Sequence, residues 1–491
     1  MAFTLSTGHP ISAWASASRS DGNTSSTITV TASAYCTWDD FWLYSTGVVA
    51  VITINGSTSY KTLFGNGNYY QSGDGTKSVS YSVSVDRDTY NKPVSWSVQF
   101  RQYTDGTDQG TKQTDSGSTT VPALASYSVS YNANGGTGAP GSQTKYYGRT
   151  LTLSSTKPTR TGYTFKGWAT SSDGSVAYAA GASYTSNSSV TLYAIWEEHC
   201  LTVNYYSNYA DYCTLKGDAV SVSSNSNTKV LTGYYYYDTQ YSDGLADAQN
   251  ENYLYLSRTG YTQTGKWGTS TSGGTLIDHK TSFSKGQALA EAFGKTLKTG
   301  NASVNVYAQW RENKLTVTYY SNYADYIDSD ETLLNTVSAD KNVAIFKYEF
   351  KYATSYNTYG LANYSNPSGS LYMTRTRYDA TGYWCTTNAE DVKLEGNKND
   401  VLTYDGGIAI GENKGFDSGQ ALAQALGLSL EDGDRSINLY ANWVLLCSKI
   451  TIYQADGTPI RGLVRIYDDD GNVRYGIVTV YDSDGNACVV V

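Results

Sequence analysis

The sequence is poor in the residue types that most often carry catalysis, bind metals or build helices. Its 491 residues include three histidines, two methionines, seven prolines and six cysteines, and only 16% of them are charged. None of the histidines (His9, His199 and His279) has a partner at the spacing of a zinc-binding set. Phosphate loops, dinucleotide fingerprints and Gly-x-Ser-x-Gly motifs are missing. We therefore expect no catalytic residue, no cofactor and no metal, and predict that the chain is not an enzyme.

The acidic clusters do not change this expectation. Asp39-Asp40 and the acids of 431–434 are sequence neighbours, whereas a glycosidase holds two carboxylates roughly 5–10 Å apart across a cleft. Residues 468–472 and 482–486 resemble calcium loops, but they lack the third acid and the distal glutamate. We interpret them as hairpin turns, and whether they bind calcium is left open.

Positive charge is scarce and scattered. The net charge is −9 and the pI is near 5.0, so no basic patch is available to bind nucleic acid. No stretch is long and apolar enough to insert into a membrane, and residues 1–10 lack the basic and apolar regions of a secretory signal. The cysteines form no Cys-x-x-Cys pair, so we favour unlinked thiols and leave a Cys200–Cys213 bond open.

Strand and turn formers are abundant instead, with 47 tyrosines and 47 glycines. In residues 1–125, alternating stretches at 26–32, 48–54, 78–85 and 94–100 predict strands, separated by turns such as Asn55-Gly56 and Asp105-Gly106. This pattern is typical of an antiparallel β-sandwich, which we expect to dock on a particle. Residues 118–125 read as a linker.

Residues 126–198 form the unit on which the rest of the chain is patterned. It has an alternating strand at 127–131, an Asn134-Gly-Gly loop, the motif Arg160-x-Gly-Tyr-x-Phe-x-Gly-Trp168, and a closing Leu192-Tyr-Ala-x-Trp196. This succession resembles the internalin B-repeat, also called the Listeria–Bacteroides repeat. The resemblance implies a small β-grasp-like binding or spacer module of exterior proteins, without catalytic residues.

Two altered copies follow, at 199–312 and 313–445. Residues 201–212 and 315–326 differ only at Asn204 against Thr318, so a duplication is clear. Both copies contain an added amphipathic stretch that predicts a helix, with Ser284 and Asp417 as expected N-caps. The third copy keeps Thr381-Gly-Tyr-Trp384 as its expected centre.

From these alignments we expect two groups of important residues. The Gly-Tyr pairs and tryptophans should hold the modules together, and truncating Trp310 to alanine should cost about 3–5 kcal/mol. These structural positions are Gly162, Tyr163, Trp168, Trp196, Gly260, Tyr261, Trp267, Trp310, Gly382, Tyr383 and Trp443. Outward tyrosines of the strands could form a sugar- or protein-binding face or be ordinary β surface. They are Tyr206, Tyr234, Tyr236 and Tyr320.

Residues 446–491 form a finer repeat. Ile452, Ile466 and Val480 are spaced 14 apart, as are three Asp-Gly pairs, which predicts a β-hairpin meander. Such a meander has open edges, so it packs on module 3 or associates between copies. We favour a homo-oligomer, most simply a closed trimer.

The expected function is therefore non-enzymatic. The arrangement is similar to minor structural proteins of bacteriophage, with a β-rich N-terminal domain before such repeats. It implies a virion tail, fibre or other exterior protein, assembled in the host cytoplasm, that contacts other virion proteins and a host-surface glycan or protein. The alternatives are a bacterial cell-surface adhesin and a capsid decoration protein.

Overall fold

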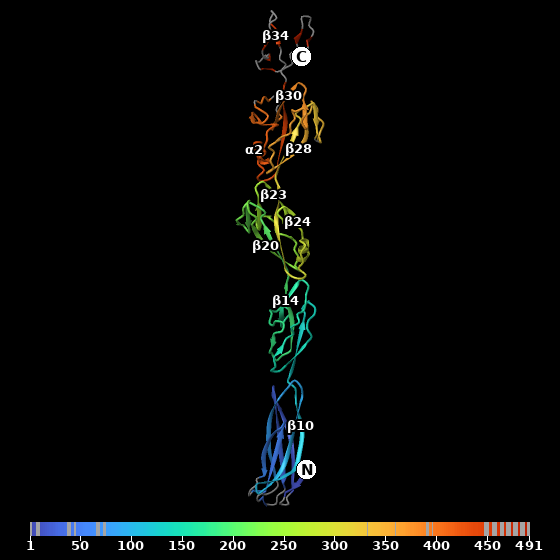
Figure 1. The fold of residues 1–491 in the computed structure, drawn as a ribbon, viewed down its shortest axis with the longest axis vertical. Helices are drawn as coiled ribbons and strands as arrows, with labels where there is room; N and C mark the ends of the chain where they lie inside the picture. The colour runs from blue at the N-terminus through green and yellow to red at the C-terminus, as the bar shows by residue number, and fades with distance from the viewer. Residues whose placement is uncertain are drawn as a thin grey trace. The chain divides into compact units, whose positions relative to one another are not determined.

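The structure is a computed structural model. It describes residues 2–5, 10–36, 41–43, 46–64, 69–71, 75–330, 332–358, 360–388, 392–394 and 396–445, together with six short strands between 451 and 488. The described chain is mainly β with two short helices, as the sequence predicts, and none of its helices is long and apolar enough to cross a membrane. It divides into two compact units, Met1–His199 with Leu297–Gly300, and Cys200–Thr296 with Asn301–Val491 (Figure 1). We call residues 1–125 the sandwich, and 126–198, 199–312 and 313–445 modules 1, 2 and 3.

The first unit begins with the predicted antiparallel sandwich. One sheet has the order β1 (Ala2–Thr4), β2 (Pro10–Asp21), β3 (Ser25–Cys36) and β8 (Gly75–Asp86), and the other has β10 (Thr107–Val121), β9 (Lys92–Thr104), β5 (Thr46–Ile54) and β6 (Ser57–Phe64). A two-stranded pair, β4 (Phe41–Leu43) with β7 (Tyr69–Gln71), accompanies them. The alternation of apolar and polar residues explains the two layers. Ile28, Val30 and Ala32 of β3 are fully buried in the core between the two sheets.

The turns and the linker follow from local chemistry. The Asn55-Gly56 and Asp105-Gly106 turns have positive φ at both residues, as a tight hairpin needs, and both lie where the sequence predicts them. Strand β10 continues to Val121, so the linker expected at 118–125 is shorter, at 122–125. The Arg87 guanidinium holds it by donating to the carbonyls of Pro122 and Ala123 at 3.1 and 2.5 Å.

Module 1 completes the first unit and sets the topology of the others. Its sheet has the order β12 (Gln143–Tyr146), β11 (Ser126–Asn132), β16 (Val190–Glu198) and β14 (Tyr163–Ala169), and a small pair joins β13 (Leu151–Thr152) to β15 (Ser183–Tyr184). The first and last strands, β11 and β16, are parallel neighbours, and β14 is antiparallel to β16. This central parallel pair is the β-grasp-like feature.

Modules 2 and 3 in the second unit repeat this order with additions. In module 2 the sheet runs β20 (Lys229–Tyr236), β17 (Cys200–Tyr206), β25 (Ala302–Glu312), β23 (Tyr261–Ser270) and β24 (Gly273–Asp278). In module 3 it runs β28 (Ala344–Lys351), β26 (Lys314–Tyr320), β33 (Arg435–Leu445), β30 (Tyr378–Cys385), β32 (Gly407–Gly411) and β31 (Val401–Tyr404). Again the first strand is parallel to the last.

Each of these modules also has a smaller sheet. Module 2 pairs β19 (Asp218–Ala219), β18 (Tyr212–Leu215), β22 (Leu254–Ser257) and β21 (Gln249–Asn250), and module 3 pairs β27 (Tyr326–Ser329) with β29 (Leu371–Thr374). The predicted helices are α1 (Gly286–Ala292) and α2 (Gly419–Ala425). Their caps are one residue later than expected: Lys285, which makes no side-chain cap, and Ser418, whose hydroxyl accepts from Ala421 N. The Gln420 amide, which Asp417 was expected to satisfy, instead donates to Tyr352 O at 3.1 Å.

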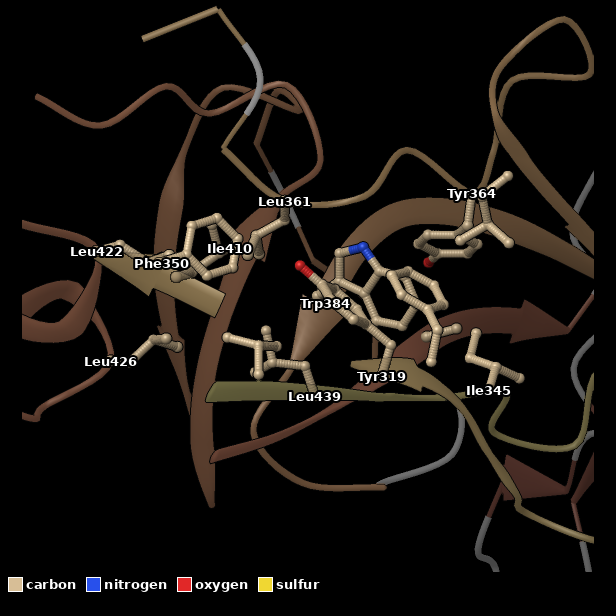
Figure 2. Close-up of a cluster of buried hydrophobic side chains, with 14 of the residues drawn as sticks. Tyr319, Ile345, Phe350, Leu361, Tyr364, Trp384, Ile410, Leu422, Leu426 and Leu439 are labelled. Atoms are coloured by element: carbon tan, nitrogen blue, oxygen red, sulfur yellow. The ribbon is translucent and has the colours of Figure 1, made fainter. Parts of the chain in front are cut away.

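One tryptophan lies at the centre of each module. Trp168, Trp267 and Trp384 are completely buried and occupy the same register beside the last strand. Each indole makes an edge contact with a tyrosine of the first strand, Tyr131, Tyr205 and Tyr319, at ring-centre distances of 4.9, 4.8 and 4.6 Å. Figure 2 shows Trp384 with Tyr319 and Tyr364 in the core of module 3.

The tryptophans of the last strands are less uniformly buried than the sequence predicts. Trp443 is buried, but Trp196 and Trp310 are half-buried. Tyr364 accounts for the difference, because its ring lies 5.5 Å from Trp443 and module 2 has the small Ala248 at the corresponding place before its β22. All three indoles donate to backbone carbonyls of the loop that follows the first strand.

That loop contains an asparagine whose role the sequence did not reveal. Asn134, Asn208 and Asn322 have φ of 48°, 47° and 45°. Their side-chain amides donate to the carbonyls of Ala194, Ala308 and Ala441, at 3.0, 2.7 and 2.8 Å. These alanines stand opposite the central tryptophans in the sheet register. The asparagine therefore ties the first loop to the last strand at the same point in every module.

The structure corrects the alignment of module 3. The Arg-x-Gly-Tyr turns of modules 1 and 2 correspond to Arg375-x-Arg377-Tyr378, not to Gly382-Tyr383, because Tyr163, Tyr261 and Tyr378 pair with equivalent last-strand residues. Arg377 has φ of 73°, close to Gly162 at 82° and Gly260 at 79°. Arg160, Arg258 and Arg375 each cover the following tyrosine, at 3.7, 4.0 and 3.9 Å. Gly382 instead matches Gly265, since each carbonyl accepts the amide of the residue that follows a later strand, Glu412 after β32 and His279 after β24.

Glycine in these turns permits a close contact. In the second unit Gly260 N donates to Glu431 O at 2.9 Å, and a Cβ on Gly260 would lie 2.3 Å from the Tyr352 ring. Asn313 adds a bond from its amide to Leu430 O at 2.7 Å. The first unit has the same pattern: Gly162 N donates to Lys298 O, and His199 Nδ1 donates to Leu297 O at 2.6 Å.

The C-terminal strands form hairpins as predicted. Strand β34 (Thr451–Tyr453) pairs with β35 (Pro459–Arg461), β36 (Ile466–Tyr467) with β37 (Val473–Arg474), and β38 (Val480–Tyr481) with β39 (Ala487–Cys488). The Asp-Gly turns between them lie outside the described residues. Of the cysteines whose side chains the structure describes, Cys200, Cys213 and Cys385 are unlinked, so Cys200 and Cys213 do not pair.

The first testable expectation compares two tryptophans of module 2. Trp267→Ala removes a completely buried indole and should cost about 3–5 kcal/mol, whereas Trp310→Ala should cost clearly less because that indole is half-buried. Hydrogen–deuterium exchange of the full chain, read on β17 and β25, measures both losses. An equal or larger loss for Trp310→Ala would show that the closing tryptophan is the anchor.

Candidate functional site

The tyrosine runs alternate between the core and the surface as the sequence predicts. In β20 Tyr235 is only 8% exposed, whereas Tyr234 and Tyr236 are 58% and 44% exposed. In β17 Tyr205 is buried and Tyr206 is half-buried. Outward tyrosines therefore do form a surface on module 2.

On the outer face, tyrosines of the first and last strands form pairs that recur in modules 2 and 3. Tyr206 stacks on Tyr307 with ring centres 5.2 Å apart, and Tyr320 lies 4.9 Å from Tyr440. The parallel register places each pair directly opposite on the first and last strands. The structure thus joins Tyr206 and Tyr320 to partners that were not singled out in the sequence.

A second recurring pair lies on the smaller sheets. Tyr212 and Tyr326 are 51% and 52% exposed, and their rings lie 6.2 and 6.5 Å from Tyr255 and Tyr372. Alternation in β18 and β27 could have indicated them, but both strands are only four residues long. Modules 2 and 3 therefore each present two tyrosine pairs.

Module 2 also has a hollow that the sequence did not predict. Its volume is about 560 Å³. It is lined by strands β17 and β20, which we call its floor, and by the segment 241–253 and the two residues after β24, which we call its walls and rim. The lining residues used below are Tyr205, Gly233, Tyr235, Tyr241, Asp243, Asp247, Asn250, Tyr253, His279 and Lys280.

Two phenol groups meet at the floor of the hollow. Tyr205 Oη and Tyr235 Oη are 2.5 Å apart, and Tyr205 Oη also accepts the amide hydrogen of Ala246. Burial raises the pKa of both tyrosines, and the pKa of Tyr235 reaches about 12. Both groups therefore stay protonated and able to donate at neutral pH.

The rim carries charges of both signs. Asp243 and Asp247 supply carboxylates, and Lys280 supplies an ammonium group. His279 is buried behind Asp247: its Nδ1 donates to Gly265 O at 2.7 Å, and its Nε2 lies 3.6 Å from the Asp247 carboxylate. No cluster of three or more metal-ligating side chains occurs among the described residues.

Module 3 fills the corresponding space. Phe346 stands where module 2 has Leu231 and stacks on Tyr319 at 4.5 Å, and Tyr348 stands where module 2 has Gly233. Glu412 takes the place of His279, since its amide bonds Gly382 O as that of His279 bonds Gly265 O. The buried Glu412 carboxylate accepts from Tyr364 N and Ser365 N and pairs with Lys398 at 2.7 Å. These polar groups of module 3 are used internally, whereas those of module 2 line a hollow.

Comparisons with known proteins support part of this picture. The family model of the Listeria-Bacteroides repeat domain matches residues 127–195, so module 1 is such a domain, and its presence suggests a surface- or adhesion-type repeat protein. None of the curated proteins matches the chain. Among solved structures, the Bacillus anthracis TIE protein is similar at 7% identity and a TM-score of 0.27, over 88% of this chain and 74% of that chain. At that TM-score the likeness does not establish a shared fold.

The raised pKa of Tyr235 predicts an alkaline loss of stability. The unfolded chain loses this proton near its ordinary pKa of 10 and the folded chain near 12, so the stabilisation is present below about pH 10 and is lost by about pH 12. The loss should be about 2–3 kcal/mol. Tyr235→Phe, which copies Phe350 of module 3, should reduce it.

Urea unfolding monitored by tryptophan fluorescence at pH 8 to 11.5 tests this expectation. The parent and Tyr235→Phe should converge in stability as the pH rises. Parallel pH profiles for the two proteins would contradict it.

Proposed function

We propose that this chain is a non-enzymatic adhesion protein in which modules 2 and 3 provide the contact surface. The observation that carries this proposal is the recurrence of two tyrosine pairs in both modules. Tyrosine offers a large, rigid contact area with a hydroxyl, and it loses little conformational entropy on binding. The module 1 repeat domain supports the adhesion-type setting.

The proposed partner is a host-surface glycan or protein, and the proposed location is the exterior of a bacteriophage virion. In this setting the sandwich docks on other virion proteins in a tail or fibre and the modules extend the binding surface. The sandwich has a core of its own between two sheets, with strands of up to 15 residues in β10, which supports its role as a separate docking domain. A bacterial cell-surface adhesin and a capsid decoration protein are the alternative settings.

Adhesion of the full chain to cells of candidate host bacteria tests the contact surface. Replacing Tyr206 and Tyr320 together by serine should reduce bound protein roughly tenfold, because each change removes one member of a pair. Tyr60→Ser is the matched control, since Tyr60 is 64% exposed on the sandwich. Unchanged adhesion of the double variant would exclude the Tyr206–Tyr307 and Tyr320–Tyr440 pairs as the contact. Mass spectrometry of purified virions decides between the virion and the cellular setting.

The C-terminal hairpins are the proposed oligomerisation element. Within the described strands of 451–488, each strand pairs with one neighbour, which leaves an edge of each hairpin for another copy. A closed trimer would satisfy these edges by cyclic symmetry. The alternative is packing on module 3 of the same chain.

Deleting residues 447–491 should convert the oligomer to a monomer in light scattering and leave the modules folded. The control is a full-length chain at the same micromolar concentration. A monomeric full-length chain would contradict this role of the hairpins.

A further inference from the structure

We propose that the hollow of module 2 binds a neutral saccharide unit. This inference rests on the proposed adhesion function and deepens it, because it names the ligand class and assigns it to one module. It uses residues that are separate from the outer tyrosine pairs.

The size of the hollow suits a small ligand. Its volume of about 560 Å³ falls within the range of roughly 300–1,000 Å³ found for small-molecule sites. Gly233 keeps it open: a Cβ there would lie 3.0 Å from the Tyr235 ring and 3.3 Å from the Tyr205 ring. In module 3 the paired strand has Tyr348 at this position, so the same sheet face is covered.

The floor offers a hydrogen-bond donor without needing a charge. The Tyr205 and Tyr235 hydroxyls share one hydrogen in their 2.5 Å bond. Tyr205 is completely buried and accepts the Ala246 amide, so when it donates to Tyr235 the Tyr235 hydroxyl hydrogen is left for a ligand. A buried donor of this kind favours a ligand with an acceptor oxygen, since burying it without a partner is costly.

The rim selects against anionic ligands. The Asp243 and Asp247 carboxylates outnumber the single Lys280 ammonium group, so they repel a phosphate or a carboxylated sugar. The same groups suit hydroxyls, which donate to carboxylates and accept from an ammonium. Asn250 adds an amide that can do both.

Aromatic walls suit the C–H face of a pyranose ring. Tyr253 is 40% exposed and Tyr241 is half-buried, so both present ring surface to the hollow. Burying that surface against an apolar sugar face stabilises the complex, and the hydroxyls orient it. A neutral hexose or N-acetylhexosamine combines all of these features.

Saturation-transfer NMR on the full chain tests the proposal, with methyl α-glucoside, N-acetylglucosamine and lactose as neutral probes. Choline and sialic acid serve as the cationic and anionic probes. At least one neutral sugar should show transfer, and Gly233→Tyr should weaken it by at least about tenfold because the ring fills the hollow. Asp243→Asn should weaken it less.

The control is Tyr348→Phe, a change at the equivalent position of module 3, which should leave sugar binding unchanged. Circular dichroism and hydrogen exchange of β17 verify that Gly233→Tyr is folded. Sugar binding that survives Gly233→Tyr overturns the proposal, as does transfer only to choline or only to sialic acid, or transfer to none of the probes.

Failure here is distinguishable from failure of adhesion. If no sugar binds but the Tyr206 and Tyr320 double variant still loses adhesion, the contact surface stands and the hollow is not a saccharide site. If sugar binds in the hollow but the double variant adheres normally, the Tyr206 and Tyr320 pairs are excluded as the contact and the saccharide site stands.

Discussion

The burial of one tryptophan beneath the parallel strand pair is the interaction on which each module depends. The first and last strands of a module are far apart in sequence, so their pairing must offset a large loop-closure entropy. Trp168, Trp267 and Trp384 help to provide that stabilisation by packing against a tyrosine of the first strand. The asparagine in the following loop then fixes the register, because its amide reaches only one carbonyl of the last strand. A slip by one residue would lose that bond and turn the tryptophan to the other face.

Differences between modules 2 and 3 can be understood as two ways of covering the same central indole. In module 3, Tyr364 and Phe346 pack around Trp384 and Tyr319, and the closing Trp443 becomes buried. The Tyr364 hydroxyl is satisfied by the carbonyls of Tyr383 and Asn442 at 2.9 and 2.8 Å. In module 2, Ala248 and Leu231 stand at these places, and Gly233, where module 3 has Tyr348, leaves a hollow beside Tyr205 and Tyr235. Trp267 and Trp384 still donate to backbone carbonyls, of Ala246 and Ala362, both at 2.6 Å, so the anchor is the same while its surroundings differ.

The difference between modules 2 and 3 fits a repeat protein in which one copy takes on a role that the other does not have. Module 3 uses Glu412 internally, where it is buried against Lys398, and Phe346 and Tyr364 pack in its core. Module 2 keeps its acidic and basic groups at the rim of an open hollow. A protein that displays two similar modules can keep the tyrosine surface on both and specialise one of them, because each module has its own core.

The sequence by itself was sufficient for the fold class, the duplication and the two added helices, since these depend on alternation, turn chemistry and repeated motifs that are local. It also identified which tyrosines of a run face outward, because side chains alternate along a strand. It misaligned the centre of module 3, because Arg377 adopts the positive φ that the sequence suggested for a glycine. Which tryptophan is fully buried, and where a hollow remains, was decided only by the tertiary structure. Both depend on contacts between different strands and segments, such as Tyr364 with Trp443 and Gly233 with Tyr205, and side-chain volume across such contacts has no local signature in the sequence.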